Sequence, residues 1–270
     1  MNKLLYIFAL CILLAGCEKN EAPSNVNRND AALAFVKALS NGQEIVQNEF
    51  QYSTDGKIKT ALGYKDYSKN IISYKRVYSY EDDKLASSEI QMDISSSLYA
   101  VNYIYSKTQY EYSNNLIIQS NYLSKKNDQY ELTSFTTYTY NDKKLPVKVS
   151  RYAAGGSLYA YSTYTYDESG NVILSEDYQL NALGEPVKNM QRSYQYDDKK
   201  NPYKNAYTLL ENIPYSINQN NITASAWTDY STNPQGNTGN SITKYNSYNS
   251  YGYPTSMDEQ GNIFLLEYKW

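Results

Sequence analysis

The residues of this chain whose types and spacing could do chemistry are adjacent carboxylates. Two carboxylates could serve a glycoside hydrolase, which holds an acid and a nucleophile or base a defined distance apart across a cleft. Asp and Asn also initiate turns by hydrogen bonding to their own backbone. We therefore expect turn formation and solubility from these pairs, and a carboxylate-dependent hydrolase remains the enzymatic alternative. The four pairs are Asp82/Asp83, Asp167/Glu168, Asp197/Asp198 and Asp258/Glu259.

Other common catalytic chemistries lack their residues. The chain contains no histidine, which excludes a Ser-His-Asp triad, a His-Cys pair and histidine metal ligands. Carboxylate and amide oxygens in turns could hold calcium, but no acidic turn has the alternating spacing of an EF-hand loop. We therefore expect no catalytic residue, no metal site and no cofactor.

The N-terminal segment has the pattern of an export signal. Lys3 precedes an apolar stretch over residues 4–14 that is short for a membrane-spanning helix. The stretch ends in Leu-Ala-Gly-Cys, which resembles the lipobox of bacterial lipoproteins. The resemblance implies that residues 1–16 are a signal peptide and that the thiol of Cys17 accepts a diacylglycerol. The mature chain would then lack a free thiol, since the other cysteine is Cys11, and thiolate catalysis, cysteine zinc sites and intrachain disulfides are excluded.

The residues after Cys17 predict a tether and a location. Residues 17–29 are polar and contain Pro23, which is typical of a linker. In such lipoproteins an aspartate directly after the lipidated cysteine favours retention in the inner membrane. This chain has Glu18 at that position, so we expect an outer-membrane lipoprotein, and surface display is a further expectation. The membrane is thus one predicted partner. The net charge of −3 argues against nucleic acid as another.

Tyrosine dominates the composition. The chain has 33 tyrosines, 5 phenylalanines and 2 tryptophans, and tyrosine is favoured in strands and at half-hydrated surfaces. An aromatic sheet face could stack sugar rings or bind a peptide strand, so a glycan or a protein is the candidate partner. The alternative is that the tyrosines pack against one another or fill a barrel. The candidate ligand-binding residues are Trp227, Tyr164, Tyr166, Tyr194 and Tyr196.

A repeat of roughly 30 residues organises the chain. Each copy begins with a tyrosine, continues into an acidic or Asn-rich turn, and resumes with apolar residues. Each copy has room for two strands, so the array predicts roughly 14–16 antiparallel strands. The anchor tyrosines are Tyr52, Tyr80, Tyr112, Tyr140, Tyr166, Tyr196 and Tyr248.

The turn of each copy has a conformational prediction. Asp or Asn starts the turn, and Gly170, Lys144 or Lys200 occupies a position that we expect to be left-handed, closing a type I turn with a G1 bulge. The tyrosines that precede the turn occur in pairs two residues apart, such as Tyr164/Tyr166. These pairs share one face of the sheet and could form an aromatic ladder across neighbouring strands.

We predict an all-β fold, an up-and-down antiparallel meander of hairpins over residues 44–270 that forms a closed or nearly closed barrel. A strongly curved open sheet is the alternative. Residues 30–43 are predicted to form a short helix that ends at Gly42. Residues 201–221 break the repeat and are predicted to run over one rim. The alternating C-terminal residues 264–270 resemble the last strand of outer-membrane barrels, and we expect a soluble closing strand because other strands lack an apolar lipid-facing band.

The repeat carries two resemblances. The stretch Tyr164 to Asn171 looks like the YD repeats of RHS-type proteins. The copies that contain Asn201-Pro202 and Tyr253-Pro254 look closer to a family of uncharacterised, tyrosine-rich bacterial lipoproteins. These are domains of unknown function with a porin-like fold. The resemblance spans about residues 44–270, judged from the repeat spacing. It implies a β fold and a lipid anchor, and no catalytic residues.

These observations favour a lipid-anchored, non-enzymatic binding module for a glycan or a protein. A structural or assembly component without a ligand site is the alternative. The hydrolase is the third hypothesis, and it requires two carboxylates from different repeats in one cleft.

Overall fold

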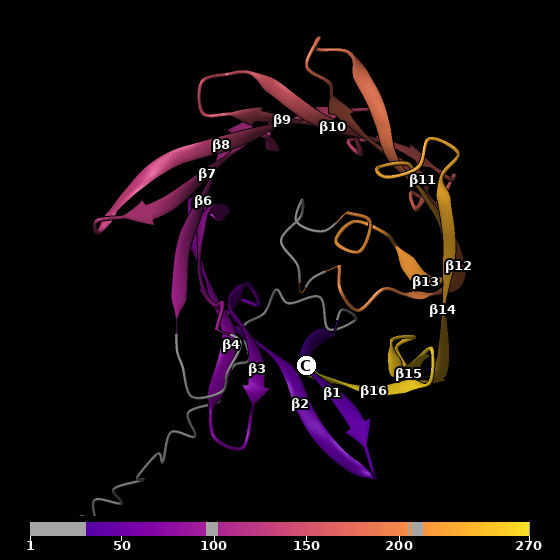
Figure 1. Cartoon of the computed structure of the whole chain (residues 1–270). Coiled ribbons are helices and arrows are strands. Elements are labelled where there is room, and N and C mark those ends of the chain that lie inside the picture. Colours follow the sequence, from indigo (N-terminus) through magenta and orange to yellow (C-terminus); the bar gives the residue numbers. More distant parts are fainter. Residues whose placement is uncertain (1–30, 96–101, 205, 207–212, 270) are drawn as a thin grey trace, which may run out of the picture.

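The barrel is closed. The computed structural model describes residues 31–95, 102–204, 206 and 213–269; Cys17, the predicted signal peptide and tether, and Trp270 lie outside them. Sixteen strands form one antiparallel sheet around a lumen (Figure 1). The strands are β1 Ala32–Ser40, β2 Gln43–Tyr52, β3 Ile58–Asp66, β4 Ile71–Glu81, β5 Lys84–Asp93, β6 Tyr103–Ser113, β7 Leu116–Lys126, β8 Gln129–Tyr140, β9 Pro146–Ala153, β10 Leu158–Tyr166, β11 Val172–Leu180, β12 Pro186–Lys200, β13 Asn220–Asp229, β14 Asn237–Tyr248, β15 Pro254–Glu259 and β16 Asn262–Lys269.

The predicted meander and its closure are confirmed. Each strand pairs with its neighbours in the chain, and β1 also pairs with β16 from Ala32↔Lys269 to Leu39↔Ile263. The open curved sheet is therefore wrong. Closure leaves no unpaired edge at which another chain could add a strand.

The short helix predicted over residues 30–43 is wrong. The described part of this segment is strand β1, followed by a turn in which Asn41 and Gly42 have φ of 50° and 76°. Val36 pairs with Asn48 of β2 and with Leu266 of β16. A helix would leave both partner strands with an open ladder, so tertiary pairing overrides local helix preference. The repeat domain accordingly begins at β1 rather than at residue 44.

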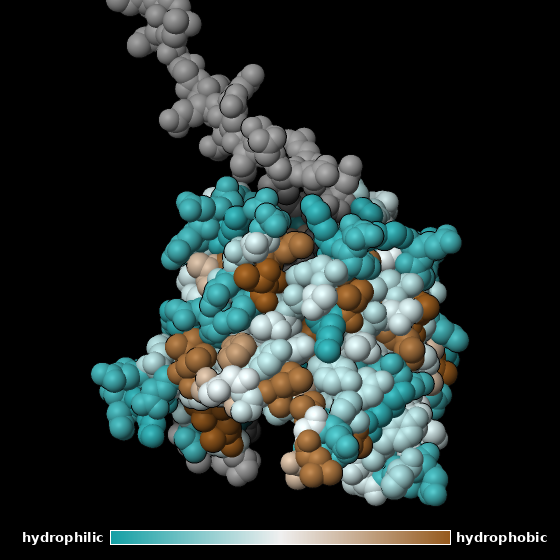
Figure 2. Space-filling model, turned by 90° about the horizontal axis from the view of Figure 1, so that it is seen from above, coloured by the Kyte–Doolittle hydropathy of each residue, from teal (hydrophilic) through white to brown (hydrophobic). Residues whose placement is uncertain are grey.

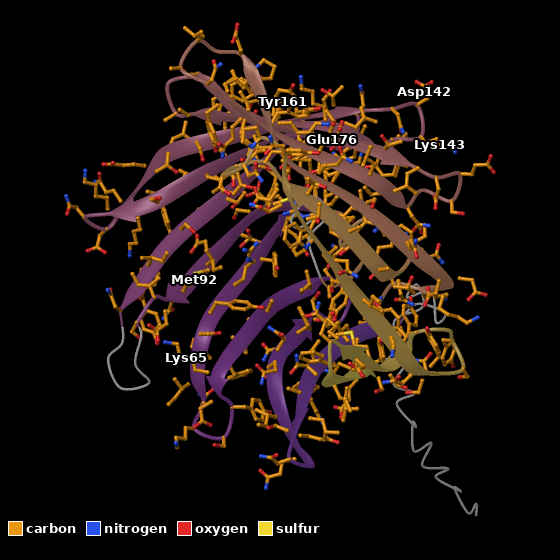
Figure 3. The ribbon with its side chains drawn as sticks, turned by 45° about the vertical axis from the view of Figure 1, so that its right-hand side comes forward. Lys65, Met92, Asp142, Lys143, Tyr161 and Glu176 are labelled. Atoms are coloured by element: carbon orange, nitrogen blue, oxygen red, sulfur yellow. The ribbon has the colours of Figure 1, made fainter. Side chains whose placement is uncertain are left out.

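Most tyrosine-anchored turns have the predicted geometry. Gly170 has φ of 89° and donates its N–H to the Asp167 carbonyl at 3.2 Å, while the Asp167 carboxylate accepts the N–H of Asn171 at 2.8 Å. Lys144 has φ of 61° in the equivalent turn, whose tip residues Asp142 and Lys143 project from the barrel (Figure 3). The prediction for Lys200 is wrong, because β12 runs through that position.

A ring of eight tyrosines, which we call the tyrosine girdle, lies inside the barrel near the end where these turns lie. Each tyrosine ends or nearly ends an even-numbered strand, and its hydroxyl donates to a backbone carbonyl on the preceding strand at 2.5–3.3 Å. Each girdle bond thus adds a hydrogen bond between an even-numbered strand and the strand before it, beyond the ladder bonds of the sheet. Its members are Tyr52, Tyr80, Tyr112, Tyr140, Tyr166, Tyr196, Tyr245 and Tyr268.

Seven of the eight girdle bonds follow one rule. Tyr140 bonds the carbonyl of Ile117, and Ile117 pairs across the sheet with the preceding girdle residue, Tyr112. The same relation closes the ring, because Tyr52 bonds Leu33 and Leu33 pairs with Tyr268. The exception is Tyr268, whose acceptor Pro254 pairs with Tyr248 rather than with the girdle residue Tyr245.

Two details of the predicted tyrosine array change. Tyr245 takes the position expected for Tyr248, because β14 is bulged between these residues. Tyr248 instead donates to the carboxylate of Asp197 at 2.9 Å. The eighth girdle residue, Tyr268, falls in the C-terminal strand, where the acidic turn motif does not follow.

A second aromatic layer lies next to the girdle. Tyr110 and Tyr138, each two residues before a girdle tyrosine, are buried with Phe50 in the hydrophobic core. Ser120 and the Tyr138 hydroxyl share a hydrogen bond of 2.8 Å. Burial raises the pKa of Tyr140 to about 12, so this girdle hydroxyl stays protonated and donates at neutral pH. Packing of the lumen, the alternative reading of the tyrosines, therefore accounts for many of them.

The outer wall carries polar and charged groups along its strands. Lys107 pairs with Glu89 at 3.0 Å, and Lys188 with Glu176 at 2.5 Å. Figure 2 shows hydrophobic residues on one side of the wall as separate patches among hydrophilic ones. Tyr161 stacks on Tyr178 at 4.7 Å between ring centroids, and Figure 3 places Tyr161 and Glu176 in the same part of the wall.

The last strand closes the barrel with its aromatic residues turned inward. Leu266 is buried, and Phe264 and Tyr268 pack against the core. They pair with inward-facing positions of β1, so the alternation that resembles an outer-membrane strand fills the lumen instead. Among the residues that the structure describes, no helix is long and apolar enough to cross a membrane.

Removing one girdle hydroxyl should destabilise the barrel. Tyr140→Phe leaves the carbonyl of buried Ile117 without its 2.6 Å hydrogen bond, which should lower the free energy of unfolding by about 1–2 kcal/mol. Urea unfolding of the full chain in detergent measures this. Tyr161→Phe on the outer wall is the matched control, and its free energy of unfolding should lie within about 0.5 kcal/mol of wild type. Equal losses of stability in both variants would show that the girdle hydrogen bond of Tyr140 contributes no more than an outer-wall hydroxyl.

Candidate functional site

A pocket of about 480 Å³ lies in the lumen against strands β9 to β13. Its volume falls in the range of roughly 300–1,000 Å³ that is usual for small-ligand sites. One wall is the sheet, and the other is the segment 213–215, which precedes β13. The lining residues are Val149, Arg151, Tyr164, Ser175, Asp177, Arg192, Tyr194, Ile213, Pro214, Tyr215, Ser225 and Trp227.

Three of the five candidate ligand-binding residues line this pocket. Tyr164, Tyr194 and Trp227 come from β10, β12 and β13 and meet in the lumen. The other two, Tyr166 and Tyr196, belong to the tyrosine girdle, and their hydroxyls donate to the carbonyls of Pro146 and Val172 at 2.6 and 2.5 Å. The structure therefore separates the candidates into a pocket set and a girdle set.

The irregular segment predicted over residues 201–221 does not run over a rim in its described part, and its last two residues belong to β13. Its described residues fold into the ring of strands (Figure 1), and Ser216, Ile217 and Asn218 are buried there. Pro214 and Tyr215 of this segment line the pocket. The reason is spatial: sixteen strands enclose a lumen wider than the inward side chains fill, and an insertion between β12 and β13 occupies part of it.

Asparagine side chains fasten this segment to the wall. Asn218 accepts the N–H of Val172 at 2.9 Å and donates to the Tyr196 hydroxyl at 2.8 Å. Asn171, which ends the best-preserved turn motif, accepts the N–H groups of Gln219 and Asn220 at 2.9 and 3.1 Å. The segment thus connects directly to a turn and to the girdle, which holds one pocket wall in place.

The acidic pair Asp197/Asp198 lies within strand β12 and not in a turn as predicted. The Asp197 carboxylate accepts the backbone N–H of Asn221 at 3.1 Å and its side-chain N–H at 2.9 Å. It also accepts the Tyr248 hydroxyl. Asp197 therefore has a structural role at the base of the inserted segment.

A row of inward side chains crosses the pocket wall, one per strand from β9 to β13. Arg151 donates to the Ser162 hydroxyl at 3.0 Å, and Ser162 donates to the Asp177 carboxylate at 2.5 Å. The other oxygen of Asp177 accepts from Arg192 at 2.9 Å. Trp227 pairs across the sheet with Arg192. We call these five residues the luminal row.

The Trp227 ring lies over a glycine of the next strand. Gly239 pairs with Trp227, and a Cβ atom at Gly239 would stand 2.1 Å from the ring. A side chain at this position would displace the indole, so the glycine provides the space in which the ring lies against the wall.

Burial raises the pKa of the tyrosine hydroxyls in the pocket. The pKa values of Tyr164 and Tyr194 both rise, chiefly because burial disfavours the phenolate. The pKa of Tyr215 rises for the same reason, with a smaller contribution from Glu259. These phenols are neutral at pH 7, so the charges of the pocket lining are those of Arg151, Arg192 and Asp177.

The arrangement can bind but offers little for hydrolysis. Asp177 is the one carboxylate among the described residues of the lining, and it is bonded to Ser162 and Arg192. A glycosidase needs two carboxylates facing the same bond. In the part of the chain that the structure describes, no group of three or more acidic residues is placed to hold a metal ion.

Sequence reasoning missed Arg151, Asp177 and Arg192. A signal was present, because Arg192 lies two residues before Tyr194 and therefore shares its inward face. A charged residue at an inward position of a strand departs from the packing pattern and marks a lumen site. Asp177 and Arg151 lie two residues after Ser175 and Val149. Their strands carry no tyrosine pair at these positions to indicate which residues face the lumen, so the inward orientation of Asp177 and Arg151 is harder to predict.

Comparison with known proteins supports the fold. A crystal structure of a porin-like protein from Bacteroides uniformis is similar to this chain with a TM-score of 0.51 and 11% sequence identity, over 88% of this chain and 96% of that one. At that identity the similarity shows the shared fold alone, and it agrees with the porin-like fold implied by the sequence resemblance. No protein-family profile matches the chain, and no curated protein does.

Two further structures have weaker similarity. A protein of unknown function from Bacteroides fragilis has 15% identity and a TM-score of 0.35, over 46% of this chain and 94% of that one. A structure of TcdB2-TccC3 has 9% identity and a TM-score of 0.31, over 80% of this chain and 14% of that one.

Filling the space at Gly239 should move Trp227. Gly239→Ala places a methyl group within the present position of the indole, so the fluorescence of Trp227 should shift towards that of a more hydrated ring, measured in a Trp270→Phe background. Gly155→Ala is the matched control, because nothing lies within 4 Å of its Cβ position. Unchanged emission in the Gly239 variant would contradict the described packing of Trp227.

Proposed function

We propose that this protein is a non-enzymatic binding protein, anchored to the outer membrane by a lipid on Cys17, and that its luminal pocket binds a carbohydrate. The observation that carries the proposal is the meeting of an indole ring with fixed polar groups in one pocket. Trp227 lies beside Arg192 and on the same row as Asp177.

The chemistry of a sugar suits this lining. One face of a pyranose ring carries C–H groups that pack on an aromatic ring, and its hydroxyls require hydrogen-bond partners when they leave water. Trp227 supplies the ring, while Ser175 and Tyr194 supply hydroxyls that already share a bond of 3.3 Å. Mixed apolar and convergent polar groups are characteristic of ligand pockets.

The outer wall supports anchoring by a lipid rather than insertion of the barrel. Pairs such as Lys107–Glu89 stand on the outer face of mid-strand positions. A lipid-facing wall would carry a continuous apolar band there, because charged groups at the centre of a bilayer cost several kcal/mol. A polar barrel at the membrane would use another attachment, and a lipid on Cys17 in the Leu-Ala-Gly-Cys sequence would supply it.

Binding of oligosaccharides to the full chain in detergent tests the proposed ligand. A glycan panel should contain chains that bind, and Trp227→Leu should weaken their binding by about 2 kcal/mol, roughly 30-fold, because truncating a buried aromatic anchor costs that much. Tyr161→Leu removes an aromatic ring from the outer wall and should leave affinity unchanged. Absence of binding to any chain of the panel would favour a structural component without a ligand site.

The lipid anchor has its own test. Cys17→Ala removes the proposed acceptor thiol, so the protein should move from the membrane fraction to the soluble fraction when cells are fractionated. Cys11→Ala is the matched control, since this cysteine lies in the predicted leader and its loss should leave the protein with the membrane. A Cys17 variant that stays membrane-bound would contradict the anchoring mechanism.

A further inference from the structure

Arg151 is an unneutralised cation in the pocket. Among the described residues, the guanidinium of Arg151 has one hydrogen-bond partner, the Ser162 hydroxyl at 3.0 Å. No carboxylate of the described residues lies within ion-pair distance of this guanidinium. Arg192, by contrast, pairs with Asp177 at 2.9 Å. A guanidinium has five N–H donors in a rigid fork, so most of the donors of Arg151 are available to a ligand.

The luminal row orients Arg151 without cancelling its charge. The proton of the Ser162 hydroxyl points to Asp177, so Arg151 donates to a lone pair of an oxygen that is already committed. Asp177 is held in turn by Arg192. The guanidinium is thus directed by a chain of hydrogen bonds whose carboxylate serves the other arginine.

The charge of the pocket lining is positive. Two arginines face one carboxylate, and burial keeps the phenols of Tyr164 and Tyr194 neutral. Elsewhere on this part of the wall the lysines serve the outer face, where Lys148 lies over the Tyr161 ring at 4.4 Å. The excess charge therefore belongs to the lumen side at Arg151.

Arg151 and Trp227 stand at opposite ends of the luminal row. The row crosses β9 to β13, four inter-strand spacings, which is roughly 19 Å along the wall. This backbone spacing separates the two side chains along the wall of one pocket, and a chain of more than one ring laid across the strands can contact both. A free anion would contact Arg151 but would leave Trp227 unused.

We infer that the pocket selects an acidic oligosaccharide, in which Arg151 binds the carboxylate of a uronic acid unit while Trp227 packs against another ring of the same chain. This inference rests on the proposed carbohydrate-binding function. A carboxylate is the group that matches the planar fork of an arginine with two parallel hydrogen bonds. Arg151 acts as the specificity-determining residue, and the Asp177–Arg192 pair serves as its positioning support.

Titration of the full chain in detergent with matched pairs of oligosaccharides tests the inference. Each pair consists of a uronic acid chain and its carboxyl-reduced counterpart, which differ by a carboxylate against a hydroxymethyl group. The acidic member should bind at least about tenfold more tightly in the preferred pair, and its affinity should fall with added salt while that of the neutral member does not.

Variants assign the preference to the residue. Arg151→Gln should weaken binding of the acidic member far more than that of the neutral member and so remove the difference between the two, a selective loss that a mere loss of folding would not give. Arg151→Lys keeps the charge without the fork and should retain part of the preference. Lys148→Gln removes a cation from the outer wall and should leave the preference intact.

The outcomes separate the two proposals. Equal binding of acidic and neutral members would overturn the acidic specificity while leaving carbohydrate binding in place. No binding of any member would overturn the proposed function itself. A preference that appears only when sulfated and desulfated chains are compared would overturn the assignment of Arg151 to a carboxylate. Binding of an acidic peptide in place of every sugar chain would overturn carbohydrate binding, the proposed function itself.

Discussion

The hydrogen bond from a tyrosine hydroxyl to a carbonyl of the preceding strand is the interaction on which this barrel depends. It occurs eight times, once between each even-numbered strand and the strand before it. At the seam of the barrel it runs from Tyr52 to Leu33, which pairs with Tyr268 of the last strand. A tyrosine serves here because the ring fills the lumen while the hydroxyl reaches a backbone carbonyl of the preceding strand. The chain has no need of cysteine cross-links in this architecture, since closure and the girdle satisfy the strand ends.

Girdle and pocket are two layers of one lumen. In the girdle layer the aromatic residues are committed to backbone carbonyls, so Tyr166 and Tyr196 have little left to offer a ligand. Further along the same strands the inward residues change from tyrosine to Arg151, Asp177 and Arg192, and the inserted segment before β13 supplies the opposite wall. The barrel therefore separates stability from binding along its axis, and Asn218 joins the two by contacting Tyr196 while it holds the segment.

The strand array, the turn chemistry and the closing role of the last strand could all be predicted from residue types. The spacing of the tyrosines indicates which residues of a strand share one face of the sheet. Asp, Asn, Gly and Lys at fixed turn positions indicate where the chain reverses direction. The site was only partly predictable. Tyr164, Tyr194 and Trp227 were candidates because of their ring chemistry, but their meeting with Arg151 depends on contacts between residues far apart in the chain. The same limit explains the helix expected over residues 30–43, where local preference was overruled by two partner strands.

The sequence by itself determined an all-β repeat, its turns and its candidate anchor at Cys17, because these depend on neighbours within a few residues and on period two along a strand. Tertiary structure decided which tyrosines are structural and which line a pocket, and it placed residues 213–219 of the segment predicted to run over a rim within the lumen. The physical reason is closure: the space inside a barrel is set by the number of strands and their stagger. What fills that space depends on long-range contacts such as those of Asn171 and Asn218, which no local pattern records.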